Sequence, residues 1–98
     1  MTRAPLAALA LALLLGGCAS TPAPPGTQVE LARIEAAAVP GKATRASVQA
    51  ALGSTRKVVF DSGYQSWLYQ VPRGAGRYAE FVILFDPAGV VAKTRLRD

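Results

Sequence analysis

The sequence predicts an α+β domain in which two short N-terminal helices pack on a three- to four-stranded antiparallel β-meander. Up to Leu52, apolar residues recur at helical spacing. From Arg56 onward they alternate with polar residues, and turns rich in Gly and Pro separate the alternating runs. An antiparallel sheet can keep one face in water while helices cover the other, so these elements suffice for one small domain.

The first predicted helix spans residues 28–38. Leu31, Ile34 and Ala38 form a narrow apolar stripe along it, and the Pro40-Gly41 pair ends it. A helix of three turns is marginally stable alone, so we expect this stripe to dock on the sheet.

The second predicted helix spans residues 45–52. Thr44 is a favourable N-cap, and Val48 and Leu52, one turn apart, form the face that packs inward. Gly53 follows directly and is expected to provide the left-handed C-terminal cap. Because the third helical position is Ser47 rather than Glu or Gln, we expect no reciprocal capping box.

Four alternating runs make up the predicted sheet. They are residues 57–60, 64–71, 78–85 and 90–96, joined by a turn at 61–63, a loop at 72–77 and a turn at 86–89. The third run is apolar on both faces, which predicts a central strand. The last run should place Val90, Ala92 and Leu96 on one face, and Lys93, Arg95 and Arg97 on the other.

An apolar segment near the N-terminus predicts export. Arg3 precedes an uncharged run over residues 4–15, which is shorter than the ~20 residues that cross a bilayer but typical of a signal peptide. The sequence Leu15-Gly16-Gly17-Cys18 that follows resembles a bacterial lipobox, and Cys18 is the one cysteine of the chain. The alternative is an ordinary secretory signal with a chance cysteine near its cleavage site.

The lipobox implies cleavage between Gly17 and Cys18 and attachment of lipid to the Cys18 thiol. The chain then divides into a signal peptide (1–17), a lipidated cysteine with a Pro-rich tether (18–27) and a folded domain (28–98). Ala19 stands where an Asp would favour retention in the inner membrane, so we expect a lipid-anchored protein on the periplasmic face of the outer membrane.

Charge narrows the class of partner. Removal of Arg3 with the signal peptide leaves ten Lys and Arg residues against six Asp and Glu. This modest basic excess favours anionic phospholipid headgroups or an acidic protein partner. It does not favour nucleic acid, because the cations are dispersed along the chain.

The residue inventory argues against catalysis. The chain has no His, its one Cys is assigned to the lipid, and no cluster of residues has the spacing of a zinc site. We therefore expect no enzyme activity, no catalytic residues, no metal site and no cofactor other than the covalent lipid on Cys18.

Three segments resemble the SmpA/OmlA (BamE-like) family of small outer-membrane lipoproteins. They are residues 41–48 with Leu52-Gly53, residues 67–69, and residues 81–86 with 89–91. The positions that match the family motifs are Thr44, Val48, Leu52, Gly53, Trp67, Tyr69 and Gly89. The sequence departs from the family pattern at Thr55, where a Pro is common, and in residues 60–64. The resemblance implies an ααβββ domain that faces the periplasm, contacts an envelope protein complex, and assists outer-membrane protein assembly or envelope integrity.

Two groups of residues are candidate interfaces. The first is the turn Asp61-Ser62-Gly63 with Tyr64, for which a plain hairpin turn is the alternative. The second is the basic stripe of Lys93, Arg95 and Arg97, which could meet lipid phosphates or form a solvated face that blocks aggregation. Trp67 and Tyr69 could anchor a partner, but their alternation with Val71 favours the core.

Two other functions remain open at this point. One is a structural envelope lipoprotein that binds anionic lipid headgroups or peptidoglycan through the basic stripe. The other is a small protein-inhibitor-like module, for which no exposed inhibitory loop is evident in the sequence.

Overall fold

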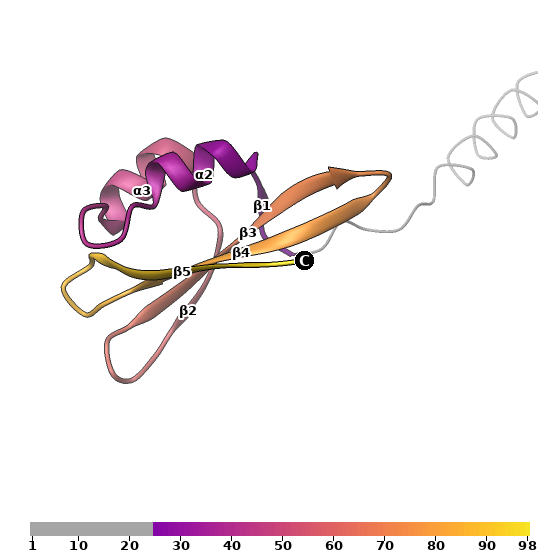
Figure 1. The fold of residues 1–98 in the computed structure, drawn as a ribbon. Coiled ribbons are helices and arrows are strands. Elements are labelled where there is room, and N and C mark those ends of the chain that lie inside the picture. The colour runs from indigo at the N-terminus through magenta and orange to yellow at the C-terminus, as the bar shows by residue number, and fades with distance from the viewer. Residues whose placement is uncertain (1–24) are drawn as a thin grey trace, which may run out of the picture.

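The computed structural model describes residues 25–98 as two layers, with two helices covering one face of a twisted five-stranded sheet (Figure 1). The helices are α2 (Leu31–Ala37) and α3 (Arg45–Leu52). The strands are β1 (Thr27–Gln28), β2 (Arg56–Val59), β3 (Gln65–Gly74), β4 (Arg77–Phe85) and β5 (Val91–Arg97). The predicted lipobox, with Gly17 and Cys18, lies outside the described residues.

The sheet corrects the predicted fold class, because it is mixed rather than an antiparallel meander of three or four strands. Strands β2 to β5 do run antiparallel to their neighbours in sequence, but β1 pairs with β3 in parallel. The strand order is β1-β3-β4-β5, and β2 shares the outer edge of β3 with β1. A strand of two residues is too short to produce the alternation by which the other strands can be predicted.

Thr55 holds β1 in place. Its Oγ1 accepts the backbone N–H of Thr27 at 2.9 Å and donates to the backbone carbonyl of Leu68 on β3. The Thr27 hydroxyl donates in turn to the Ser54 carbonyl at 2.6 Å. Thr27, predicted to end the tether, and Gln28, predicted to begin the first helix, therefore both lie in the sheet. The helix begins three residues later than predicted, at Leu31.

Helix α3 has the predicted bounds, and Thr44 is its N-cap. The prediction that it lacks a reciprocal capping box is wrong. The Ser47 N–H donates to Thr44 Oγ1 at 3.1 Å, and the Thr44 N–H donates to Ser47 Oγ at 2.9 Å. A serine hydroxyl at the third position thus performs the reciprocal role usually filled by Glu or Gln.

The end of α3 is also more extended than predicted. Gly53 has the expected positive φ of 86°, but its ψ of 172° is far from the left-handed helical value. The Gly53 N–H still donates to the Gln49 carbonyl, and the chain leaves the helix directly toward β2.

The hairpin between β3 and β4 is tighter than predicted. Both strands continue into the expected loop over residues 72–77, leaving a turn at Ala75-Gly76. Strand β4 lies between β3 and β5, which confirms its predicted central place.

A bulge changes which residues of β5 face the helices. Leu84 pairs with Lys93, whereas Phe85 pairs with Val91, so Ala92 is the extra residue. Val91 is therefore buried, and the prediction that Val90, Ala92 and Leu96 share one face is wrong. Lys93, Arg95 and Arg97 keep a common face, as predicted, because they lie beyond the bulge.

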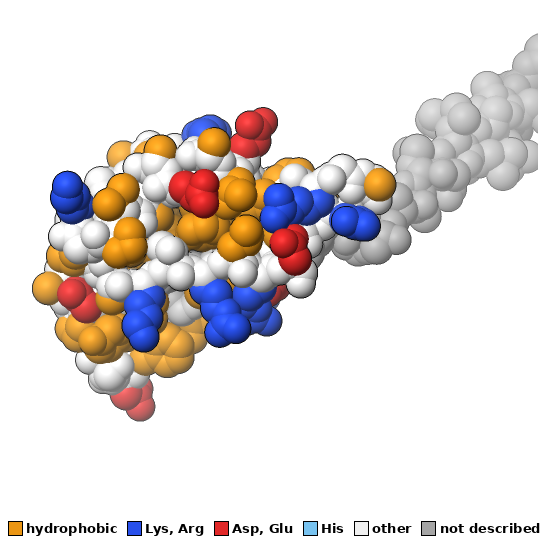
Figure 2. All heavy atoms as spheres, viewed as in Figure 1, with side chains coloured by type: hydrophobic (Ala, Val, Ile, Leu, Met, Phe, Trp, Pro, Cys, Tyr) orange, Lys and Arg blue, Asp and Glu red, His pale blue; other side chains and the backbone are white. Residues whose placement is uncertain are grey.

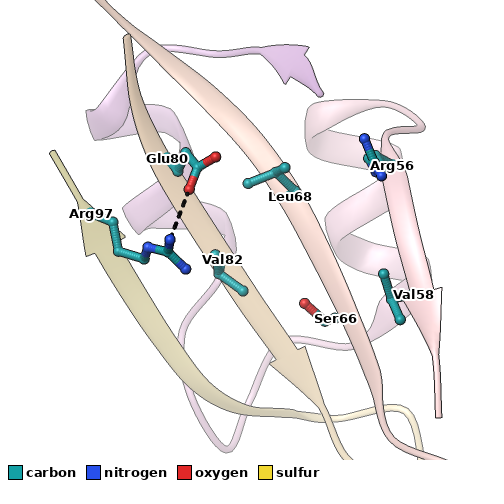
Figure 3. A pocket seen from close by; sticks show the side chains of 7 residues that line it. All are labelled: Arg56, Val58, Ser66, Leu68, Glu80, Val82 and Arg97. Carbon is teal, nitrogen blue, oxygen red and sulfur yellow. Dashed lines mark ion pairs between the residues drawn. The ribbon is translucent and has the colours of Figure 1, made fainter. Parts of the chain in front are cut away.

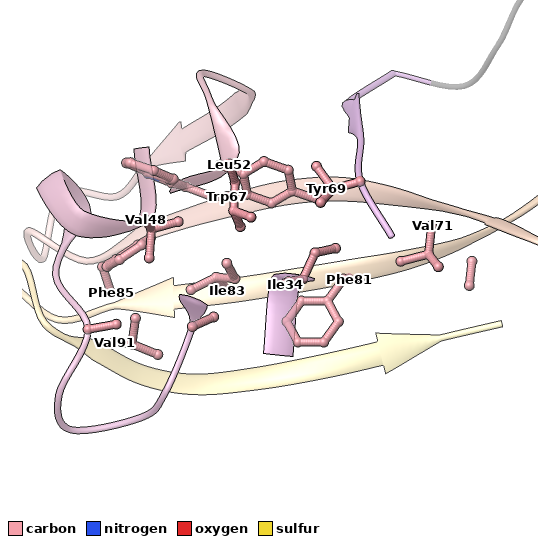
Figure 4. Close-up of a cluster of buried hydrophobic side chains, with 14 residues drawn as sticks. Ile34, Val48, Leu52, Trp67, Tyr69, Val71, Phe81, Ile83, Phe85 and Val91 are labelled. Carbon is pink, nitrogen blue, oxygen red and sulfur yellow. The ribbon is translucent and has the colours of Figure 1, made fainter. Parts of the chain in front are cut away.

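The core lies between the helices and the sheet (Figure 4). Its largest members come from both layers: Ile34, Val48, Leu52, Trp67, Tyr69, Val71, Phe81, Ile83, Phe85 and Val91. Full burial of side chains of this size stabilises a fold by about 1.5–3 kcal/mol each. This cluster is the principal reason why the two short helices remain docked.

Candidate functional site

The face of the sheet opposite the helices, here called the open face, is the candidate functional surface. Its central row crosses four strands, because Arg56 pairs with Leu68, Leu68 with Val82, and Val82 with Arg95. Directly paired residues project to the same side of a sheet. This row therefore places two apolar side chains between two cations.

A second row has a similar composition. Val58 pairs with Ser66, Ser66 with Leu84, and Leu84 with Lys93. Val58 is 48% exposed, which is high for an aliphatic side chain on a strand. Apolar side chains thus continue along the middle of the open face, and β5 again supplies a cation at its margin.

A cavity of about 340 Å³ lies over the first row (Figure 3). Its lining includes Arg56, Leu68 and Val82 from the row and the pair Glu80 and Arg97 beside it. The Arg97 guanidinium lies 3.5 Å from the Glu80 carboxylate, and both side chains are more than a third exposed. An ion pair of this kind contributes about 0–1 kcal/mol and leaves Arg97 free to contact a partner.

Positive charge predominates on the open face. Arg56, Lys93, Arg95 and Arg97 project from it, and the acidic residue Glu80 lies beside the two rows, paired with Arg97. Figure 2 shows blue Lys and Arg side chains close to patches of orange hydrophobic side chains on the side of the domain that it displays. The combination of cations with an apolar centre suits a partner that is both acidic and apolar.

The predicted turn interface lies at one end of the same sheet. Asp61, Ser62 and Tyr64 are exposed at the tip of the β2–β3 hairpin. The turn requires glycine at position 63. Its φ is +92°, which other residues rarely adopt, and an added Cβ would lie 3.1 Å from the Pro87 side chain. The contact with Pro87 places this turn beside the β4–β5 turn, next to the start of the basic stripe.

Exposed apolar residues adjoin that turn. Val59 is 67% exposed and Phe60 is 45% exposed, just before Asp61. Both fall within the predicted strand over residues 57–60. Val59 is exposed because β2 pairs with β3 alone and lies beyond the helices (Figure 1). Phe60 lies outside β2, which ends at Val59, and begins the turn, where its N–H donates to the Tyr64 carbonyl at 2.9 Å.

Trp67 and Tyr69 belong to the core, as the alternation of β3 predicts. Trp67 is 2% exposed, its ring centroid lies 4.5 Å from that of Phe85, and Lys57 Nζ lies 4.4 Å from the ring centroid. Tyr69 is fully buried and donates its hydroxyl to the Gly53 carbonyl at 2.8 Å. Burial raises the pKa of Tyr69 to about 12.

The other family-motif positions also have structural roles. Val48 and Leu52 are buried under α3. The Gly89 carbonyl accepts the N–H of Arg45, and the Arg45 guanidinium packs where a side chain at Gly89 would lie. None of these positions reaches the open face.

Most of the open-face residues were missed by the sequence analysis. Arg56, Leu68 and the other row members are far apart in the chain and meet only through the strand register. A partial signal was present, because the second apolar face of β4, with Val82 and Leu84, had no helix to cover it.

A second cavity, of about 700 Å³, lies at the far end of the sheet. Arg73, Arg77, Tyr78 and Asp98 line it. Arg73 is already engaged by Asp98 through two hydrogen bonds of 3.1 and 3.2 Å. This cavity therefore offers less free positive charge than the open face.

Within residues 25–98, no three His, Cys, Asp or Glu side chains come together as a possible metal site. Neither described helix is long and apolar enough to cross a membrane. Comparison with known proteins finds no match to this chain among family models, curated proteins or solved structures.

Proposed function

We propose that this protein is a non-enzymatic outer-membrane lipoprotein that faces the periplasm and assists outer-membrane protein assembly or envelope integrity. The observation that carries the proposal is the single cysteine at the end of an uncharged apolar run, in the lipobox-like sequence that ends at Cys18. The ordered motifs that resemble the SmpA/OmlA family support the envelope role.

The open face supports a docking role. It offers an apolar centre and a basic margin. A lipid anchor would hold such a surface near the membrane, where an envelope complex could engage it. Because Thr27 lies in β1, the Pro-rich tether is limited to residues 19–26 and could extend about 25 Å.

Labelling with radioactive palmitate tests the anchor. We expect Cys18→Ser to abolish labelling and to leave an uncleaved or soluble product, because serine has no thiol to accept the diacylglycerol. Ser20→Ala is the matched control, since it changes a nearby hydroxyl and keeps Cys18; it should label normally. Normal labelling of the Cys18→Ser protein would refute the lipoprotein assignment.

Recovery from solubilised membranes tests the envelope role. The proposal predicts that the protein is isolated together with components of the β-barrel assembly machinery. Recovery without any such component would leave the anchor intact but refute this specific role.

One structural feature favours a second candidate function, binding to anionic lipid headgroups or peptidoglycan. Lys93, Arg95 and Arg97 share the open face, as a contact with a polyanionic surface requires. Replacing all three by Gln should then abolish binding to phosphatidylglycerol vesicles or to sacculi. The same replacement of Arg33, Lys42 and Arg77 is the control, and equal binding by both triple variants would exclude this function.

A further inference from the structure

The spacing of charges on the open face restricts the shape of its partner. Neighbouring strands lie about 4.8 Å apart, so the Cα atoms of Arg56 and Arg95, three strands apart in one row, are separated by about 14 Å. Leu68 and Val82 occupy the positions between them. The face is therefore an apolar lane with a cation on either side.

We infer that this lane binds an amphipathic helix of a protein partner, one whose apolar stripe is flanked by acidic residues. The inference deepens the proposed docking role by specifying the chemistry of the partner. A helix with its side chains is about 10–12 Å wide, which matches the distance between the two basic margins. Its apolar residues would pack on Leu68, Val82 and Leu84, and its carboxylates would meet Arg56 on one side and the stripe of β5 on the other.

A helix fits this face better than an extended strand does. Added strands bind along a sheet edge through backbone hydrogen bonds, whereas the residues here project from the face. Helices are the usual cover for the apolar face of a sheet, and α2 and α3 already cover the opposite face in this way (Figure 1). The partner helix would complete a three-layer arrangement.

The charges select an acidic helix. The two rows carry three cations, Arg56, Arg95 and Lys93. Arg97 lies beside them, and the Glu80 carboxylate is already within 3.5 Å of it. A helix with basic flanks would meet Arg56 and Arg95 at close range, where like charges repel. Acidic flanks give attraction on both sides of the lane.

The chain itself does not supply such a helix. Residues 1–24 contain no Asp or Glu, so they cannot match the basic margins. In a second copy, α2 does carry Glu35, but its apolar residue Ile34 is fully buried in its own core. A lipid surface would satisfy the cations but would offer no helix-shaped apolar stripe to Leu68 and Val82.

Binding of a designed peptide tests the inference. The probe is a fluorescent 18-residue alanine-based helix with leucines along one stripe and glutamates on both sides of it; in a control peptide, lysines replace the glutamates. Fluorescence anisotropy with the full chain in mild detergent should show binding of the glutamate peptide only. Binding should weaken as salt is raised, because screening reduces the attraction between exposed charges.

Three variants locate the binding site. Arg56→Glu should weaken binding of the glutamate peptide by about tenfold or more, because it reverses one margin of the lane. Val82→Ser should also weaken it, by removing apolar contact at the centre. Lys42→Glu makes the same charge change in the loop between the helices, outside the lane, and should bind as the unchanged protein does. Circular dichroism establishes that each variant is folded.

Four results would overturn the inference. They are failure of the glutamate peptide to bind, equal binding of the lysine peptide, an unchanged affinity in folded Arg56→Glu, and an equal loss in Lys42→Glu.

If the glutamate peptide fails to bind while phosphatidylglycerol vesicles bind in a manner that depends on Arg56, the face is a membrane surface. If it fails because the protein self-associates through Val82, as sedimentation would show, the face is a dimer interface. The palmitate experiment is independent of these results. Failure of the helix-binding inference would therefore not contradict the assignment of Cys18 as the lipid-attachment site.

Discussion

Tyr69 donates its hydroxyl to the Gly53 backbone carbonyl over 2.8 Å, and so ties the middle of β3 to the end of α3. The ring is fully buried between the two layers. Burial also penalises the charged phenolate, which raises the pKa of Tyr69 to about 12 from the usual value of 10. One side chain thus links the sheet, the helix cap and the response of the fold to alkaline pH.

Tyr69 should make the domain less stable at high pH. Its folded pKa lies above its unfolded pKa, so its stabilisation is complete below pH 10 and is lost as the pH rises from about 10 to about 12. The loss approaches 2–3 kcal/mol, at about 1.4 kcal/mol for each unit of pKa difference. Tyr69→Phe should remove this dependence and lower the free energy of unfolding by about 1 kcal/mol at neutral pH, through loss of the hydrogen bond.

Urea unfolding at intervals between pH 8 and pH 11.5 measures both effects of Tyr69→Phe. Tyr64→Phe is the control, because Tyr64 is exposed at the hairpin tip. Other groups that titrate in this range affect all the proteins alike, so the difference between variants isolates Tyr69. Parallel curves for Tyr69→Phe and the unchanged protein would contradict the prediction.

Thr55→Val should release β1 from the sheet. The substitution keeps the shape of the side chain but removes the hydroxyl that accepts from Thr27 and donates to Leu68. We expect a loss of about 1–3 kcal/mol in the free energy of unfolding, since two backbone groups lose a partner. Hydrogen exchange should show the Thr27 amide losing its protection.

Thr94→Val controls for the change from Thr to Val on a strand, because Thr94 lies within β5 and is partly buried. It should leave the exchange of the Thr27 amide unchanged. Retained protection of that amide in Thr55→Val would show that β1 is held by other contacts.

Ile34→Ala should unfold much of the protein. Ile34 is the one buried residue of α2 and is fully enclosed, so its truncation leaves a cavity under the helix. Such changes cost about 2–5 kcal/mol, which is a large part of the stability of a domain this small. Thermal unfolding followed by circular dichroism measures the loss. Glu35→Ala, on the exposed side of the same helix, should change the midpoint little; equal effects would place the core elsewhere.

The elements with strong periodicity could be predicted from sequence, and those that depend on register could not. The α3 bounds follow from Thr44 and Gly53, and the burial of Trp67 follows from alternation along β3. Strand β1 has two residues and no local signal, and the bulge at Ala92 depends on how β5 pairs with β4. The same holds for the candidate site. The basic stripe is visible in one strand, but its relation to Arg56 exists only once four strands are aligned.

The capping box of α3 gives the last prediction. Thr44 and Ser47 cap each other reciprocally. Substitution of either residue by Ala removes the acceptor of one hydrogen bond and should weaken the other. Thr44→Ala should cost about 0.5–2 kcal/mol and Ser47→Ala somewhat less, because the cap acceptor itself contributes most. The double variant should then lose less free energy of unfolding than the two single losses added together, by about 0.5 kcal/mol or more.

Urea unfolding of the four proteins measures this coupling, with Ser62→Ala as the control for removal of an exposed serine. Strictly additive losses would mean that the two hydroxyls act independently, and that Ser47 contributes only through its own bond to the Thr44 N–H.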